Sequence, residues 1–198
     1  MSGGGPLARA LREPGDPPLR PLPGAVAGLL VELAAPPRLA AHLRAVHDVA
    51  HQLVDWVRLR RPALPLDREA VLFGAATHDI GKVAWVAELS GPGAAHEEAG
   101  RRLLLERGVE PRLARFAGTH AAWDRPGVGL EDLLVSVADK VWKNKRVPDL
   151  EDRLLALLVA AGGGERWAEF LALDEELERI GAGADGRLAF QAAFPVRT

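Results

Sequence analysis

A long run of apolar residues at three- and four-residue steps constrains the fold of this chain more than any other feature of its sequence. The run extends from Arg38 to about Arg60, and its apolar members are Leu39, Leu43, Val46, Ala50, Leu53 and Val57. Because an α-helix turns once in about 3.6 residues, this spacing gathers them on one helical face. No run alternates apolar and polar residues as a half-buried strand does. The sequence therefore predicts an all-α bundle.

Gly and Pro residues divide the rest of the chain into shorter helical segments. Helices are predicted at 25–34, 67–77, 94–107, 110–122, 130–146, 150–161 and 165–180, with Asp67 as an N-cap. Residues 1–24 are rich in Gly and Pro and are expected to form a flexible segment, and 181–198 a C-terminal tail. The prediction is one helical domain at 25–180 with additional C-terminal helices. In those helices the residues expected to point inward are Trp167, Phe170, Leu171 and Leu177.

Charge and the absence of cysteine exclude several classes of function. The chain has 25 Lys and Arg against 27 Asp and Glu, so no electrostatic reason favours binding of a nucleic acid polymer or a membrane surface. Without cysteine, the chain cannot form disulfides, thiolate zinc sites, iron–sulfur clusters or thiol nucleophiles. No apolar stretch approaches the ~20 residues of a membrane span, and 1–24 lack the apolar core of a signal peptide. A cytoplasmic protein is expected.

The segment at 77–82, Thr-His-Asp-Ile-Gly-Lys, carries the sharpest chemical signal. Its adjacent His78 and Asp79 follow an apolar helix and precede a Gly, so both side chains can turn toward one ion. An imidazole is a borderline metal ligand and a carboxylate a hard one. An isolated His-Asp pair is, however, more often a polar helix end with a solvated carboxylate.

Asp139 makes the metal interpretation stronger. It shares a helical stripe with Val135 and Trp142, which predicts an inward-facing carboxylate. A buried carboxylate needs a metal ion, hydrogen bonds or a cationic partner. Both a metal ligand and a salt bridge to an Arg fit this position.

The first long helix offers three histidines. His42 lies one turn before Val46 and two turns before Ala50, so it can face inward with the apolar stripe. His47 is rotated from His42 by about 140° and His51 by about 180° around the helix. His42 is therefore favoured over His47 as a ligand, and the other two could be surface residues or support the ligands.

Together these pieces resemble the HD-domain superfamily, whose pattern is a His, then His-Asp, then a distant Asp. The matching segments are 38–53, 77–82 and 137–140, and the resemblance spans about 38–146. It implies an α-helical bundle around a divalent metal ion, and the implied ligands are His42, His78, Asp79 and Asp139.

Most characterised members of the superfamily hydrolyse phosphomonoesters, phosphodiesters or nucleotides. The metal would polarise a phosphoryl oxygen and activate a water. The resemblance therefore implies a phosphohydrolase for a small phosphorylated substrate, with Asp79 and Lys82 as catalytic residues. Lys82 would also meet a phosphate oxygen, although an exposed lysine without a role fits the sequence equally well.

His96 and His120 raise the question of whether one or two ions bind. His96, four residues before Gly100, and His120, at the end of an apparent helix, resemble the extra ligands of dinuclear HD proteins. Asp79 would then bridge two ions. With one ion, the two histidines could contact substrate or protonate the leaving group. Imidazole and carboxylate ligands suit Mn, Fe, Co, Ni or Zn and allow Mg, with Mn or Fe favoured.

A basic run follows Asp139 and comprises Lys140, Lys143, Lys145 and Arg146. On a continuous helix Lys140 and Lys143 would share one side, where they could bind an anionic substrate. Cations also suit a helix C-terminus without any ligand.

Two other functions fit the same ligand set. Some HD proteins that cleave phosphonates or inositol use four His and two Asp to hold a mixed-valence iron pair, so a di-iron oxygenase is one alternative. The other is a non-catalytic HD module that binds a nucleotide or a partner helix. Lys82 favours hydrolysis, and the intact ligand set argues against a non-catalytic module. The apolar C-terminal helices could form a homodimer face.

Overall fold

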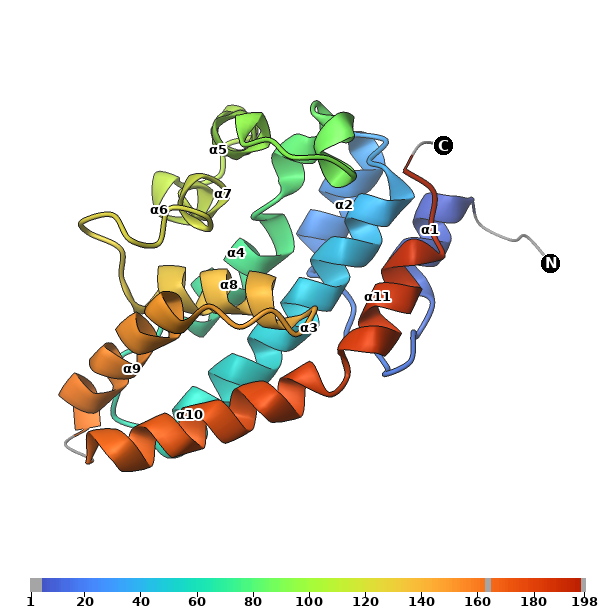
Figure 1. The fold of residues 1–198 in the computed structure, drawn as a ribbon. Helices are drawn as coiled ribbons and strands as arrows, with labels where there is room; N and C mark the ends of the chain where they lie inside the picture. Colours follow the sequence, from blue (N-terminus) through green and yellow to red (C-terminus); the bar gives the residue numbers. More distant parts are fainter. Residues whose placement is uncertain (1–4, 163–164, 197–198) are drawn as a thin grey trace.

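Helix α3 (Pro37–Arg60) runs through an all-α bundle and packs against helices from both ends of the chain (Figure 1). The structure is a computed structural model that describes residues 5–162 and 165–196. The other elements are α1 (Pro6–Arg12), α2 (Gly24–Glu32), α4 (Arg68–Thr77), η1 (Ile80–Val83), η2 (Val86–Leu89), α5 (Ala95–Glu106), α6 (Pro111–Ala114), α7 (Phe116–Thr119), α8 (Leu130–Val141), α9 (Pro148–Gly162), α10 (Arg166–Gly181) and α11 (Ala184–Ala192). No strand occurs among the described residues, which confirms the predicted all-α fold.

Helix α3 is buried on nearly all sides over its first half. It packs against α1, α4, α8 and α11, and every residue from Leu39 to Ala50 is buried. The predicted apolar stripe is correct, but burial also includes polar side chains, both on the face of this stripe and on the other faces. These are His42, Arg44, His47 and Asp48. A helix enclosed in this way can direct a polar residue toward the centre of the protein without exposing it to solvent.

Helix α4 begins and ends as the sequence predicts. Asp67 caps it, since its Oδ1 accepts a hydrogen bond from the backbone N–H of Ala70 at 3.0 Å. The helix packs against α3 and α8 and ends at Thr77. Its last turn therefore delivers His78 and Asp79 to a point where α3 and α8 are both near.

The N-terminal segment is packed, which corrects the expectation of a flexible segment at 1–24 for its described part. Helix α1 forms there and buries Ala10. The guanidinium of Arg44, only 2% exposed, donates hydrogen bonds to the carbonyls of Ala10 (2.7 Å), Glu13 (2.7 Å) and Leu19 (3.0 Å). These bonds fasten residues 10–19 to α3, a long-range effect that Gly and Pro content does not reveal.

Helix α10 turns a different face inward from the one predicted. Leu177 is buried as expected, but three other residues expected inside are exposed: Trp167, Phe170 and Leu171. The reason is the buried Glu169, whose carboxylate pairs with Arg60 at 3.0 Å and Arg61 at 2.6 Å at the end of α3. Because Glu169 faces α3, its apolar neighbours on α10 face solvent.

The expected tail at 181–198 also contains a packed helix, α11, which lies against α3. Its Arg187 is 2% exposed and donates hydrogen bonds to the carbonyls of Trp142 (2.7 Å) and Ile180 (2.5 Å). Phe190 and Phe194 are buried as well. Residues 184–194 therefore belong to the folded core and support the ends of α8 and α10.

Two predicted helices are shorter than expected. The segment at 110–122 divides into α6 and α7, since Gly118 N–H bonds to the Arg115 carbonyl in a tighter turn at 2.8 Å. The helix predicted at 130–146 ends at Val141, and Asn144 adopts a positive φ of 56° just beyond it. Asn tolerates this left-handed conformation, which is common after a helix end.

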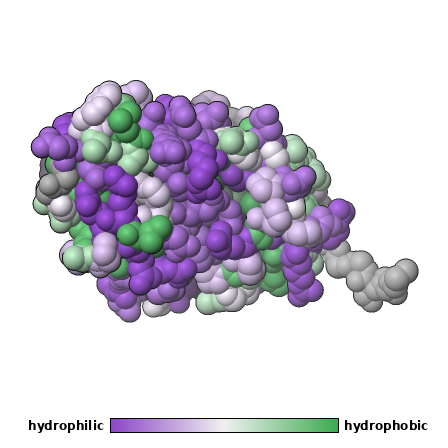
Figure 2. Space-filling model, turned by 90° about the horizontal axis from the view of Figure 1, so that it is seen from below, coloured by the Kyte–Doolittle hydropathy of each residue, from purple (hydrophilic) through white to green (hydrophobic). Residues whose placement is uncertain are grey.

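The molecular surface seen from below the view of Figure 1 is mostly hydrophilic, with hydrophobic residues in scattered patches (Figure 2). Among the described helices none combines the length and the apolar character required to cross a membrane.

Candidate metal centre

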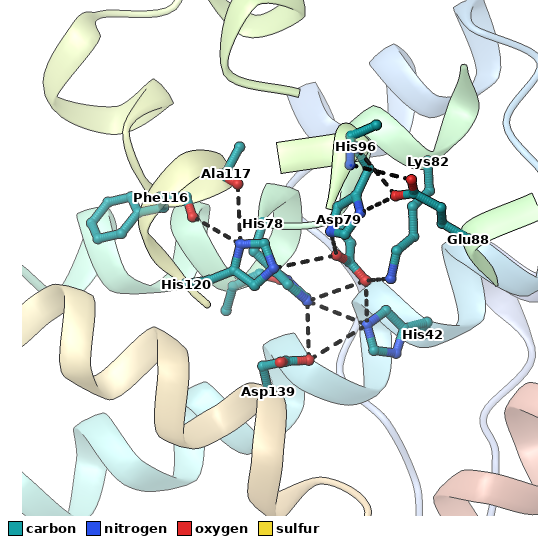
Figure 3. Close-up of polar contacts among 12 residues, drawn as sticks. His42, His78, Asp79, Lys82, Glu88, His96, Phe116, Ala117, His120 and Asp139 are labelled. Atoms are coloured by element: carbon teal, nitrogen blue, oxygen red, sulfur yellow. Dashed lines mark hydrogen bonds and ion pairs between the residues drawn. The ribbon is translucent and has the colours of Figure 1, made fainter. Parts of the chain in front are cut away.

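Six side chains from five parts of the chain converge in the interior (Figure 3). His42 comes from α3, Asp139 from α8 and His96 from α5, while His78 and Asp79 follow α4 and His120 follows α7. All six are buried. These are the six residues that the sequence analysis selected as metal ligands, and their ligand atoms form two compact groups.

The first group, here called the first triad, consists of His42, His78 and Asp139. The ligand atoms of the three residues lie within 4.8 Å of one another. The Nε2 atoms of His42 and His78 are 3.2 Å apart, and Asp139 Oδ1 lies 3.4 Å from His78 Nε2 and 3.9 Å from His42 Nε2. The ligand atoms of two imidazoles and one carboxylate therefore face one another.

The second group, the second triad, consists of Asp79, His96 and His120. Asp79 Oδ1 lies 3.0 Å from His96 Nε2 and 3.5 Å from His120 Nε2. These ligand atoms also lie within 4.8 Å of one another.

Asp79 connects the two triads. While its Oδ1 faces His96 and His120, its Oδ2 lies 3.1 Å from His42 Nε2 and 3.7 Å from His78 Nε2. One carboxylate therefore offers one oxygen to each triad, which is the arrangement a bridging ligand between two cations requires.

The outer ring nitrogens determine which way the imidazole lone pairs point. Nδ1–H of His78 donates to the Ala75 carbonyl at 2.9 Å, and Nδ1–H of His120 donates to the Ala117 carbonyl at 3.1 Å. Nδ1–H of His96 donates to the Glu88 carboxylate at 2.5 Å. With the proton on Nδ1, each Nε2 keeps its lone pair and aims it into the centre.

These lone pairs provide a test of whether the residues fit a metal. The buried Nε2 of His96 has no hydrogen-bond partner among the described residues, and it faces a carboxylate oxygen of Asp79 at 3.0 Å. Two acceptors at this distance repel each other unless a cation or a proton lies between them. Neutral imidazoles and carboxylates around a common point satisfy the needs of a divalent cation, so the residues fit one.

The ionisation states agree with a ligand role. Burial alone would raise the pKa of the Asp79 carboxyl, but the neighbouring His78, His42 and His96 hold it well below its ordinary value. Burial would likewise raise the pKa of Asp139, and His78 and Lys140 lower it strongly. Both groups are therefore carboxylates at neutral pH.

The candidate ligand histidines differ in the direction in which their pKa is shifted. Burial lowers the pKa of His42, and it lowers the pKa of His120 to about 4, so both imidazoles are neutral and can bind metal. Burial also acts to lower the pKa of His96, but Asp79 and Glu88 outweigh it and the pKa is raised. In His96 each ring nitrogen faces a different carboxylate, Asp79 at Nε2 and Glu88 at Nδ1.

Close backbone contact brings Asp79 and His96 together. A Cβ atom at Gly81 would overlap the His96 carbonyl oxygen and lie 2.5 Å from the Gly100 backbone nitrogen. Only a residue without a side chain lets η1 pack this tightly against α5. The Gly that follows the His-Asp pair in the sequence thus has a specific role in this close packing.

Two of the three lysines proposed for substrate binding pair with candidate ligand carboxylates. Lys82 Nζ is 2.5 Å from Asp79 Oδ2, and Lys140 Nζ is 2.6 Å from Asp139 Oδ2. Lys143 differs, because α8 ends at Val141 and the expected continuous helix is wrong at this point. Lys143 is exposed and its ammonium lies 5.8 Å from the centre of the Trp142 ring.

The other two histidines of α3 lie outside both triads. His47 is buried, with its ring 4.7 Å from that of His51, and burial lowers its pKa to about 3. The expectation that His47 could be a surface residue is therefore wrong, since the segment before α3 and helix α4 both cover this face.

Residues that hold the candidate ligands in position were not predicted from the sequence. Glu88 binds His96, while Asp132 on α8 accepts hydrogen bonds from Arg115 Nε at 3.1 Å and Thr119 Oγ1 at 2.9 Å. The Asp132 contacts fix α7, and with it the adjacent His120, against α8. No local spacing relates these partners, so no sequence pattern could have selected them.

The sequence model of the HD domain family matches residues 39–157, more than half of the chain. Searches of curated proteins and of solved structures found no match to this chain. The matched range contains all six residues of the two triads in the order His, His-Asp, His, His, Asp. With this match and the all-α fold, the chain belongs to the HD domain family.

Proposed function

We propose that the protein is a metal-dependent phosphohydrolase that cleaves a phosphate ester of a nucleotide or another small phosphorylated metabolite at a two-metal centre. The observation that carries the proposal is the Asp79 carboxylate, with one oxygen facing each buried triad. Membership of the HD domain family supports hydrolysis of phosphate esters.

The ligands of the first ion would be His42, His78, Asp79 and Asp139, and those of the second Asp79, His96 and His120. Divalent ions bound there would polarise a phosphoryl oxygen and lower the pKa of an attacking water. The donor atoms are imidazole nitrogens and carboxylate oxygens, which favour Mn or Fe and also allow Co, Ni, Zn or Mg.

Lys82 and Lys140 would orient the substrate. Each ammonium now pairs with a ligand carboxylate, at 2.5 Å for Lys82 and 2.6 Å for Lys140. With Asp79 and Asp139 engaged as metal ligands, both lysines would be free to donate hydrogen bonds to phosphate oxygens, which are strong acceptors. His42 packs edge-on against Trp142 with ring centres 4.9 Å apart, which keeps the first triad shielded from bulk water.

A panel assay tests the function. Protein purified without a metal-affinity tag and loaded with Mn or Fe is offered nucleotides, dinucleotides and sugar phosphates, and phosphate release is measured. We expect turnover of at least one class, its loss in Asp79→Asn, and unchanged turnover in Asp152→Asn, whose exposed carboxylate pairs with Arg166.

Absence of release from the whole panel would count against the proposal. Oxygen-dependent turnover with an iron EPR signal would instead identify the oxygenase alternative. Binding of a nucleotide without turnover would identify the non-catalytic module.

A further inference from the structure

We propose that Glu88 is a positioning residue for the second metal ion, acting through His96 to set the affinity of the second triad. The inference rests on the proposed metal centre and concerns the difference between its two positions. Glu88 lies on η2, outside both triads, and its side chain is only 10% exposed.

The Glu88 carboxylate makes three hydrogen bonds to the start of α5. Its Oε2 accepts from Nδ1–H of His96 at 2.5 Å and from the backbone N–H of His96 at 3.1 Å, and its Oε1 accepts from the backbone N–H of Ala95 at 3.2 Å. The backbone bonds fix the carboxylate to the helix N-terminus. The ring bond then fixes the orientation of His96, so that Nε2 faces Asp79.

The partner of His96 differs from those of the other three imidazoles. Nδ1 of His78 and Nδ1 of His120 bond to neutral backbone carbonyls, and Nδ1 of His42 has no partner among the described residues. Only His96 of these four donates to a carboxylate. An anionic partner makes an imidazole more electron-rich and a stronger ligand.

The two triads differ in the negative charge that their own carboxylates supply. The first triad contains its own carboxylate, Asp139, in addition to the Oδ2 atom of Asp79. The second triad has only the Oδ1 atom of Asp79. Glu88 adds a negative charge at the outer nitrogen of His96, Nδ1, and thereby raises the affinity of the second triad for a second divalent cation.

The backbone of the turn at Gly93 leaves room for the Glu88 side chain. Gly93, in the turn before α5, has a φ of 156°, and a Cβ atom there would overlap the Glu88 carboxylate. A residue with a side chain would displace Glu88 from the helix start. The turn and the carboxylate therefore form one supporting unit behind the second triad.

Metal affinity of designed variants tests the inference. Mn²⁺ binding to metal-free wild type, Glu88→Ala and Glu88→Gln is measured by calorimetry and by chelator competition. We expect Glu88→Ala to weaken the second equivalent by roughly 10- to 100-fold and to leave the first unchanged. Glu88→Gln should fall between, because its amide oxygen still accepts from Nδ1–H. The matched control is Glu98→Gln, which changes an exposed carboxylate in the first turn of α5 that pairs with Arg101.

A second readout separates positioning from general stability. In the Zn²⁺-loaded protein, long-range ¹H–¹⁵N spectra report the two ring nitrogens of each histidine. Glu88→Ala should change the His96 nitrogen signals and not those of His78, whose carbonyl partner is intact. Thermal melting in chelator checks that the variants are folded.

Three outcomes would overturn the inference: equal weakening of both equivalents, unchanged affinity in Glu88→Ala, or a wild type that binds a single equivalent. Failure of the proposed function would look different. Wild type that binds two ions and releases no phosphate would contradict hydrolysis, while the affinities of the variants would still decide the role of Glu88.

Discussion

The Nε2 atoms of His42 and His78 lie 3.2 Å apart although the two residues come from different parts of the chain. His78 donates through Nδ1 to the Ala75 carbonyl, so its Nε2 carries a lone pair toward His42. Only a proton or a metal ion between the rings makes this contact favourable. Metal uptake by the buried centre should therefore be coupled to proton release, as at other imidazole sites.

The metal stoichiometry should follow the two triads. We expect about two equivalents of metal in wild type, about one in His120→Ala, and little in Asp79→Ala, because Asp79 serves both positions. Elemental mass spectrometry of protein purified without a metal-affinity tag measures these values. One equivalent in wild type that His120→Ala leaves unchanged would restrict the centre to the first triad and Asp79.

Lys82 should contribute to turnover far more than Lys143. Lys82 Nζ lies 2.5 Å from a ligand carboxylate, whereas Lys143 is exposed beyond the end of α8. A charged hydrogen bond is worth about 1.5–3 kcal/mol, so Lys82→Met should lower kcat/KM by roughly 10- to 100-fold. Steady-state kinetics on the substrate found in the panel measures this change. Lys143→Met, the control, should stay close to wild type, and equal losses in both variants would contradict a specific role for Lys82.

His47 should make the fold sensitive to mild acid. Burial lowers its pKa to about 3, whereas the pKa of an unfolded histidine is ~6.5. Between these values the unfolded state binds a proton that the folded state excludes, so the free energy of unfolding decreases as the pH falls. The contribution is at most about 1.4 kcal/mol per pH unit.

Urea denaturation in chelator from pH 7 to pH 5 measures this slope. His47→Gln removes the titrating group, so the slope of the unfolding free energy against pH should decrease by nearly the contribution of one bound proton. His51 is less buried, so His51→Gln should decrease this slope less. An unchanged slope in His47→Gln would show that other groups carry the pH dependence.

The parts of the centre that could be predicted from sequence depend on local spacing. His78 and Asp79 are neighbours, Asp139 shares a helical stripe with Val135, and rotation about a helix distinguishes His42 from His47. His96 and His120 were selected through their resemblance to known dinuclear proteins. Periodicity also predicted the long helices, since amphipathic spacing is a local property.

The parts that could not be predicted depend on contacts between distant residues. Glu88 acquires its role only when the turn at Gly93 folds it onto α5. The outward orientation of Trp167 follows from the pairing of Glu169 with arginines more than a hundred residues earlier. Neither relationship leaves a periodic pattern in the chain.

Arg44 should be essential for stability although it lies outside both triads. Arg44→Met keeps most of the side-chain volume but leaves the carbonyls of Ala10, Glu13 and Leu19 without their donor. Unsatisfied buried acceptors are costly, so we expect a loss of about 3 kcal/mol or more in the free energy of unfolding. Chemical denaturation compares it with Arg102→Met, whose side chain is 72% exposed and should cost less than about 0.5 kcal/mol. Similar values for both variants would contradict this role.

The partners of Arg44 also bear on where this protein can be cut. The family match begins at residue 39, but the carbonyls that hold the Arg44 guanidinium lie between Ala10 and Leu19. A fragment trimmed to the matched range would lose these carbonyls together with α1 and α11, which pack against α3, and would expose to solvent the face of α3 that they cover. The smallest autonomous folding unit is thus larger than the recognisable domain, and expression fragments should retain the segment from α1 onward.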